Sequence, residues 1–302
     1  MGAGGQITYL WRFLTAVYRE YMRDDCRLMA AAISFYALLS LVPLLLVGLS
    51  TFGYVLGNDR AFDAVYAFLI QLLPQDLAAT LLPEEVAGAG LRSYLKKTLV
   101  KPAGVAGIVG VVSWIWAGTN CFVVITAALD VAWETGKRRG FIASRLIAVG
   151  MMMLVATLAL LSFGITQVLK IIREYPIPWL GIRSGEIPFL WQLVGWAVPA
   201  TLSILVFVLC YLILPDRRIG WRPALIGGVA AGMLWELAKQ GFAFYVANFV
   251  DYNSIYGSLG GLVILVMWVY LSAVMLLLGA EVASVSADWS AKSVQSPAAE
   301  DR

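Results

Sequence analysis

The sequence predicts an all-α fold: a polytopic membrane helix bundle with six transmembrane helices, plus amphipathic helices at the N-terminus and in an outer loop. Of the 302 residues, 61% are apolar and only 14% are charged, whereas a soluble domain has about 25% charged residues. The mean hydropathy is +0.81, and the apolar residues gather in runs of the length that crosses a bilayer, about 20 residues. These observations exclude a water-soluble domain and a disordered chain.

The first segment, residues 1–27, has the pattern of an amphipathic helix on the cytoplasmic membrane surface. Its apolar side chains recur at steps of three and four residues, while Arg12, Arg19 and Arg23 occupy the other side. Arginines placed in this way contact anionic lipid headgroups. The alternative is a short helix packed under the bundle, and the two interpretations are compatible.

A transmembrane domain is predicted over residues 28–285. Six apolar runs are expected to span the membrane, at residues 28–57, 103–129, 146–169, 189–214, 223–247 and 256–285. The long loop of residues 58–101 carries two amphipathic stretches that we expect at the outer face. The polar tail, residues 286–302, is expected to be disordered in the cytoplasm.

The basic residues predict that both termini are cytoplasmic. With the N-terminus inside, the cytoplasmic segments hold 13 Lys and Arg residues and the outer segments hold eight. An excess of Lys and Arg marks the cytoplasmic side of a membrane protein. Asp130 and Glu134, at the inner end of the second span, are expected to be neutralised by residues 137–139.

Prolines and glycines predict kinks and packing faces within the spans. Pro43 and Pro199 each remove a backbone hydrogen bond in mid-membrane, so we expect helix kinks there. Close helix packing is expected at two pairs of glycines spaced four residues apart, Gly228 with Gly232 and Gly257 with Gly261.

A candidate polar site lies within the spans. Glu236 and Lys239 stand three residues apart near the middle of the fifth span, close enough to pair, and a charge in a span must face protein or a water-filled cavity. The pair either handles an ion or a lipid headgroup, or only fixes the helix register. Glu281, near the inner end of the sixth span, is expected to lie close to water. Four further residues are predicted to line one cavity with the pair: Ser34, Tyr36, Asn120 and Gln240.

Several kinds of chemistry are excluded by residues that the sequence lacks. It contains no histidine, which rules out imidazole acid–base catalysis, Ser-His triads and histidine metal sites. The three cysteines, Cys26, Cys121 and Cys210, lie far apart in or beside apolar runs, so we expect buried thiols and no disulfide framework. A net charge of only +3 gives no sign of nucleic-acid binding. We expect no cofactor, no metal and no catalytic residues.

Two segments resemble a known family. They are AAAISFYALLSLVP at residues 30–43, and residues 256–281 with YGSLG, WVYL and GAE; PDRR at residues 215–218 adds to the match. This pattern is similar to the YihY/BrkB family of bacterial inner-membrane proteins, once labelled ribonuclease BN. The resemblance implies six helices, both termini inside and no settled activity, with links to serum resistance and to phospholipid movement. A nuclease would need a metal cluster and a basic surface, and the sequence has neither.

The leading hypothesis is a non-enzymatic inner-membrane protein that moves or presents lipid in envelope phospholipid transport. An ion- or proton-coupled small-solute transporter and a structural or assembly subunit of a membrane complex are the alternatives. The expected partners are membrane lipids and either an envelope lipid-transport protein or a second copy of the chain.

Overall fold

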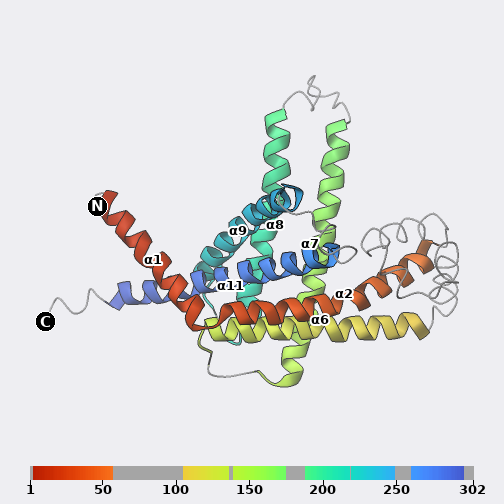
Figure 1. The fold of residues 1–302 in the computed structure, drawn as a ribbon, viewed down its shortest axis with the longest axis horizontal. Helices are drawn as coiled ribbons and strands as arrows, with labels where there is room; N and C mark the ends of the chain where they lie inside the picture. Colours follow the sequence, from red (N-terminus) through yellow and green to blue (C-terminus); the bar gives the residue numbers. More distant parts are fainter. Residues whose placement is uncertain are drawn as a thin grey trace. The chain divides into compact units, whose positions relative to one another are not determined.

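A computed structural model of the chain describes residues 3–56, 105–135, 139–174, 188–217, 219–248 and 260–295. These residues form helices and no strand (Figure 1), which confirms the predicted all-α class. Each predicted span coincides with one helix. The helices are α1 (Ala3–Arg23), α2 (Cys26–Leu56), α6 (Val105–Ala132), α7 (Phe141–Glu174), α8 (Pro188–Ile213), α9 (Trp221–Asn248) and α11 (Gly260–Gln295).

Four helices in the described part of the chain contain stretches long and apolar enough to cross a membrane. These stretches are Val111–Ala132, Phe141–Leu161, Gly195–Ile213 and Leu262–Ala291, and α2 adds a shorter one, Cys26–Leu41. The count of six spans stays a prediction. The amphipathic stretches predicted at residues 58–101 lie outside the described residues.

The chain divides into two compact units. The first consists of Met1–Ala30, Phe122–Lys239 and Val274–Arg302, and the second of Ala31–Cys121 and Gln240–Ala273. Within the first unit, α7 packs against α8 (Figure 1). Its most deeply buried side chains include Tyr211, Leu129, Met151, Leu214 and Leu277.

The second unit includes the middle of α2 and the end of α9. Ile33 and Ser34 of α2 are buried, as are Ala117 and Thr119 of α6. Phe242 of α9 and Trp268 of α11 pack with ring centroids 5.1 Å apart.

The C-terminal helix is longer than the sequence predicted. The expectation of a disordered tail from residue 286 is wrong for residues 286–295, because α11 continues to Gln295. Ser286 is buried, and Trp289 packs edge-on against Tyr9 and Phe13 of α1, with ring centroids 4.9 and 5.5 Å apart. Edge-to-face aromatic contacts of this kind stabilise packing, so the helix continues where α1 covers it.

Helix α1 packs against other helices of the first unit on one side and exposes apolar side chains on another. Val17 and Tyr21 of the predicted apolar stripe are buried, whereas Leu10, Trp11 and Leu14 are exposed. The buried residues show that the helix packs against its neighbours, and an interfacial position of the exposed face stays a prediction. A left-handed residue, Asp25 with φ 49°, separates α1 from α2.

Arg139 caps the C-terminal end of α8. Its guanidinium donates hydrogen bonds to the carbonyl oxygens of Ile213, Leu214 and Pro215, at 3.3, 3.3 and 2.7 Å. Its Nε lies 3.1 Å from Asp216 Oδ1. The last carbonyls of a helix lack partners within the helix, and a cation there also complements the helix dipole.

Candidate functional site

The charged pair predicted in the fifth span lies on α9 and forms an ion pair. Lys239 Nζ lies 2.7 Å from Glu236 Oε1, as expected for side chains three residues apart on one helix. Ser203 Oγ of α8 donates a hydrogen bond to the same carboxylate oxygen at 3.2 Å. Glu236 is 7% exposed, while the side chain of Lys239 is 36% exposed. The pair is therefore buried at its acidic end and open at its basic end.

The other four candidate polar residues belong to the second unit. Ser34 is buried, Tyr36 and Asn120 are half-buried, and Gln240 is exposed. Tyr36 packs edge-on against Phe35, with ring centroids 5.5 Å apart. Neither of the two cavities described below is lined by any of these residues. A cavity shared with the ion pair stays a prediction.

Two of the predicted packing glycines lie on α9 in close contact with α8. A Cβ atom at Gly228 would lie 2.3 Å from Val208 Cγ2, and one at Gly232 would lie 2.4 Å from Ile204 Cγ1. Only glycine leaves room for so close an approach.

The remaining packing and kink residues are described only in part. Gly257 lies outside the described residues, and Gly261 falls near the start of α11. Helix α8 continues through Pro199, and α2 includes the position of Pro43. The two kinks stay predictions.

A second close contact, which the sequence pattern did not predict, joins α9 to α11. A Cβ atom at Gly227 would lie 2.4 Å from the carbonyl oxygen of Gly279 and 2.6 Å from Ala283 Cβ. Nearby, Tyr211 of α8 donates a hydrogen bond to the carbonyl oxygen of Leu276 at 2.7 Å. The sequence feature that could have revealed this contact is the recurrence of small residues at three- and four-residue steps in both helices.

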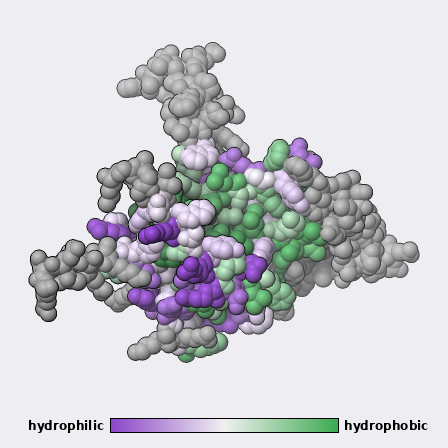
Figure 2. Space-filling view, turned by 60° about the vertical axis from the view of Figure 1, so that its left-hand side comes forward, coloured by the Kyte–Doolittle hydropathy of each residue, from purple (hydrophilic) through white to green (hydrophobic). Residues whose placement is uncertain are grey.

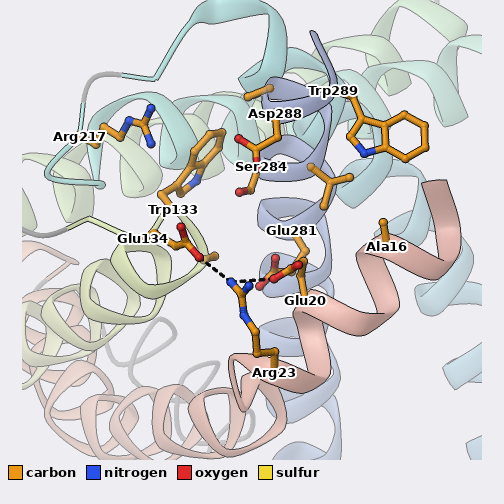
Figure 3. A pocket seen from close by; sticks show the side chains of 13 residues that line it. Ala16, Glu20, Arg23, Trp133, Glu134, Arg217, Glu281, Ser284, Asp288 and Trp289 are labelled. Carbon is orange, nitrogen blue, oxygen red and sulfur yellow. Dashed lines mark hydrogen bonds and ion pairs between the residues drawn. The ribbon is translucent and has the colours of Figure 1, made fainter. Parts of the chain in front are cut away.

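A polar cavity of about 220 Å³ lies among α1, α6, α11 and the segment after α8, all in the first unit (Figure 3). Arg23, in the last turn of α1, is held there by three carboxylates. Its Nη2 lies 2.7 Å from Glu20 Oε2 and 2.7 Å from Glu134 Oε1, and its Nε lies 3.0 Å from Asp24 Oδ1. The hydrogen bond to Asp24 raises the pKa of Arg23 above its ordinary value, so the guanidinium stays charged.

The expected neutralisation of Asp130 and Glu134 involves Lys137 and Arg138, which lie outside the described residues, so it stays a prediction; the described residues show other contacts. Glu134, whose positive φ of 47° follows the end of α6, pairs with Arg23 of α1. Asp130 Oδ1 accepts a hydrogen bond from the backbone nitrogen of Asp216 at 2.8 Å. These partners lie far away in the sequence, so the sequence pattern gave no sign of them.

Glu281 of α11 is the most deeply buried charged residue of this cavity. It is 1% exposed, so the expectation that it lies close to water is wrong. The thiol of Cys26 donates a hydrogen bond to Glu281 Oε1 at 3.3 Å. Burial favours the uncharged form of this carboxyl group, and a cation in the cavity in front of it would stabilise the charged form.

The cavity wall also carries groups whose hydrogen-bonding capacity is unused. Trp133 is 5% exposed, and its indole N–H has no acceptor among the residues that the structure describes. Four carboxylates line the cavity against two guanidiniums, those of Arg23 and Arg217. In the described part of the chain, the carboxylates do not converge as metal ligands do. The wall therefore suits an organic ligand with hydrogen-bonding groups.

An apolar cavity of about 310 Å³ adjoins the polar one. Its walls come from Tyr9, Leu10 and Phe13 of α1, Ile226 of α9, and the last turns of α11. Trp289 lines both cavities. Figure 2 shows hydrophilic side chains gathered on the face that it turns forward, with hydrophobic side chains beside them.

Long apolar helices with exposed large apolar side chains define a helical integral membrane protein. The chain belongs to the BrkB family: residues 17–302 match the family described as Virulence factor BrkB. The resemblance found in the sequence is thereby confirmed.

Curated relatives are named mainly as membrane proteins. The chain is 30% identical over 282 residues to a UPF0761 membrane protein of Nitrosospira multiformis, covering 92% of this chain and 61% of that relative. It is 31% identical to a UPF0761 membrane protein of Aliivibrio fischeri strain MJ11, covering 90% and 82%. It is 26% identical to the putative ribonuclease-like protein YfkH of Bacillus subtilis, covering 89% and 93%.

The chain thus spans less than two thirds of the Nitrosospira relative's length. No solved structure matches the chain.

Proposed function

We propose that this chain is a non-enzymatic inner-membrane protein that moves or presents phospholipid. The observation that carries the proposal is that one side chain, Trp289, lines both cavities. A polar cavity of about 220 Å³ beside an apolar cavity of about 310 Å³ matches the division of a phospholipid into headgroup and acyl chain. Binding sites of this kind combine apolar walls with a few polar groups that fix orientation.

The exposed face of α1 supports access from the membrane. Leu10, Trp11, Leu14 and Tyr18 are exposed on this helix, and Leu10 also lines the apolar cavity. Aromatic and aliphatic side chains on one face of a helix favour insertion into the interfacial region of a bilayer. A lipid would reach the apolar cavity along this face without crossing water.

The contact between α1 and α11 supports a topology with both termini on one side. Tyr9 and Trp289 pack against each other near the two ends of the chain. Together with the excess of basic residues in the N-terminal segment and the loops of that side, this favours the cytoplasmic side for both.

The pair of Glu236 and Lys239 is a second candidate site for contact with lipid, deeper in the helix bundle. Since its carboxylate end is buried and its ammonium end is open, Lys239 is the member that can meet a lipid phosphate. The membrane lipids are the proposed partners, with an envelope lipid-transport protein or a second copy of the chain as a protein partner.

A proton-coupled solute transporter is the second candidate, and Glu281 is the observation that favours it. A carboxyl group buried to 1% exposure beside a thiol is a group that could carry a proton. This alternative requires solute uptake by proteoliposomes that disappears when the proton gradient is removed.

Native mass spectrometry of protein released from native-lipid nanodiscs tests the lipid proposal. We expect the wild type to retain phospholipid and Trp289→Ala to lose it, because the substitution removes the aromatic surface that lines both cavities. Trp221→Ala changes an exposed tryptophan outside both cavities and should retain lipid. The double variant Glu236→Gln/Lys239→Met shows whether the ion pair contributes. A wild type that carries no lipid would contradict the proposal.

A further inference from the structure

We propose that the polar cavity recognises a zwitterionic headgroup with a primary ammonium, that of an ethanolamine phospholipid. The inference rests on the lipid function proposed above and names the lipid class that the cavity selects.

The acidic side of the cavity is a row of acceptors on α11. Glu281, Ser284 and Asp288 follow one another at steps of three and four residues, which places them on one helix face, and all three line the cavity. Glu20 and Glu134 already pair with Arg23. Glu281 and Asp288, in contrast, form no ion pair with any residue that the structure describes. An ammonium group is the partner that a buried carboxylate with free acceptor capacity requires.

The opposite side of the cavity offers donors. Arg217 lines it and forms no ion pair within the described residues, and the buried indole N–H of Trp133 lacks an acceptor there. Figure 3 shows Arg217 and Trp133 on one side of the cavity and the α11 row on the other. A guanidinium and an N–H group are suited to phosphate oxygens.

This division of charge decides among ligands. A simple anion would satisfy Arg217 but would meet the excess of carboxylates. A metal ion is disfavoured because no three acidic or cysteine side chains converge within the described residues. A glycerol headgroup carries no cation and would leave Glu281 without one. Only a ligand with a phosphate and an ammonium satisfies both sides at once.

Lipid competition in nanodiscs of equal phosphatidylethanolamine, phosphatidylglycerol and phosphatidylcholine tests the assignment. We expect native mass spectrometry to show phosphatidylethanolamine enriched on the wild type about tenfold over phosphatidylglycerol, the effect of one charge-assisted hydrogen bond. Glu281→Gln keeps an acceptor for the Cys26 thiol but removes the charge, and should abolish the enrichment. Arg217→Gln should lower the retention of all three lipids about threefold and leave the preference unchanged, because each lipid carries the phosphate that this exposed guanidinium would meet.

The control is Arg222→Gln, which changes an exposed arginine outside the cavity and should keep the wild-type preference. If Glu281→Gln does not fold, Asp288→Asn removes the other unpaired carboxylate of the α11 row and should reduce the enrichment. Lipid retained without class preference, or with phosphatidylcholine equal to phosphatidylethanolamine, would overturn the headgroup assignment and leave lipid binding standing. A protein that retains no lipid at all would overturn both.

Competition by soluble phosphoethanolamine distinguishes a lipid headgroup from a free soluble ligand with the same phosphate and ammonium groups. We expect it to compete for the wild type only at concentrations far above those of the lipid, because it cannot fill the apolar cavity. Tight binding of soluble phosphoethanolamine to delipidated protein, with no preference among lipids, would assign the cavity to a soluble ligand and overturn the lipid assignment.

Discussion

Glu236 shows what one buried charge requires in this protein. Its carboxylate forms an ion pair with Lys239 of the same helix and accepts a hydrogen bond from Ser203 of α8. Breaking a buried ion pair by removing one partner is more harmful than replacing both, because a single removal leaves an uncompensated charge. The pair can therefore be tested separately from any role in lipid handling.

We expect Lys239→Met alone to lower the free energy of unfolding by about 1–2 kcal/mol, a value reduced because the ammonium is partly exposed. The double variant Glu236→Gln/Lys239→Met should be close to the wild type, since it leaves no unpaired charge. Thermal unfolding in detergent, followed by fluorescence-detected size-exclusion chromatography, measures both. Equal destabilisation in the single and double variants would refute an energetically coupled pair.

Arg139 is a residue whose geometry matters more than its charge. We expect Arg139→Lys to reduce stability by about 1–2 kcal/mol, because an ammonium cannot bond three successive carbonyls and Asp216 at once. Arg222→Lys, at an exposed position, is the control and should have no measurable effect. The same thermal assay applies, and an unchanged midpoint for Arg139→Lys would show that the positive charge alone suffices.

At the scale of the helices, small residues set how closely α9 approaches its neighbours. Gly228 and Gly232 meet α8, while Gly227 meets the backbone of α11 at Gly279. The buried hydroxyl of Tyr211 ties α8 to α11 through Leu276. Close packing and hydrogen bonds between helices, including that of Ser203 with Glu236, thus hold the three helices together.

Two glycine substitutions on α9 separate packing from helix propensity. Gly227→Ala should destabilise the protein by about 1–3 kcal/mol, because the new methyl group meets a backbone carbonyl that cannot move freely. Gly241→Ala, where a Cβ atom meets nothing within 4 Å, should be neutral or stabilising by up to about 1 kcal/mol. If both variants unfold alike, the close contact of α9 with α11 is not a determinant of stability.

At the scale of the whole molecule, the helices were predictable and the cavities were not. Apolar runs mark each helix locally, and the step from Glu236 to Lys239 marks an ion pair on one helix. The contact of Arg23 with Glu134 joins residues 111 positions apart, and that of Tyr9 with Trp289 joins the two ends of the chain. Such contacts leave no periodic signal, so the cavity, the burial of Glu281 and the length of α11 appeared only in the structure.

Topology is testable at this same scale. We expect green fluorescent protein fused to either terminus to fluoresce and alkaline phosphatase fused to either terminus to stay inactive, because the proposed topology places both ends in the cytoplasm. A fusion at residue 80, in the predicted outer loop, should give the reverse result. Opposite reporter activities at the two termini would contradict an even number of spans.

The most direct test of the central claim, a lipid held across the two joined cavities, is photo-crosslinking with a phospholipid that carries a diazirine in its acyl chain. We expect saturable cross-links in the segments at residues 9–13 and 286–290, which unlabelled lipid competes away and Trp289→Ala removes. Cross-links confined to outward-facing positions such as Met153 and Leu160, proportional to lipid concentration and insensitive to competition, would show bulk lipid only and contradict the claim.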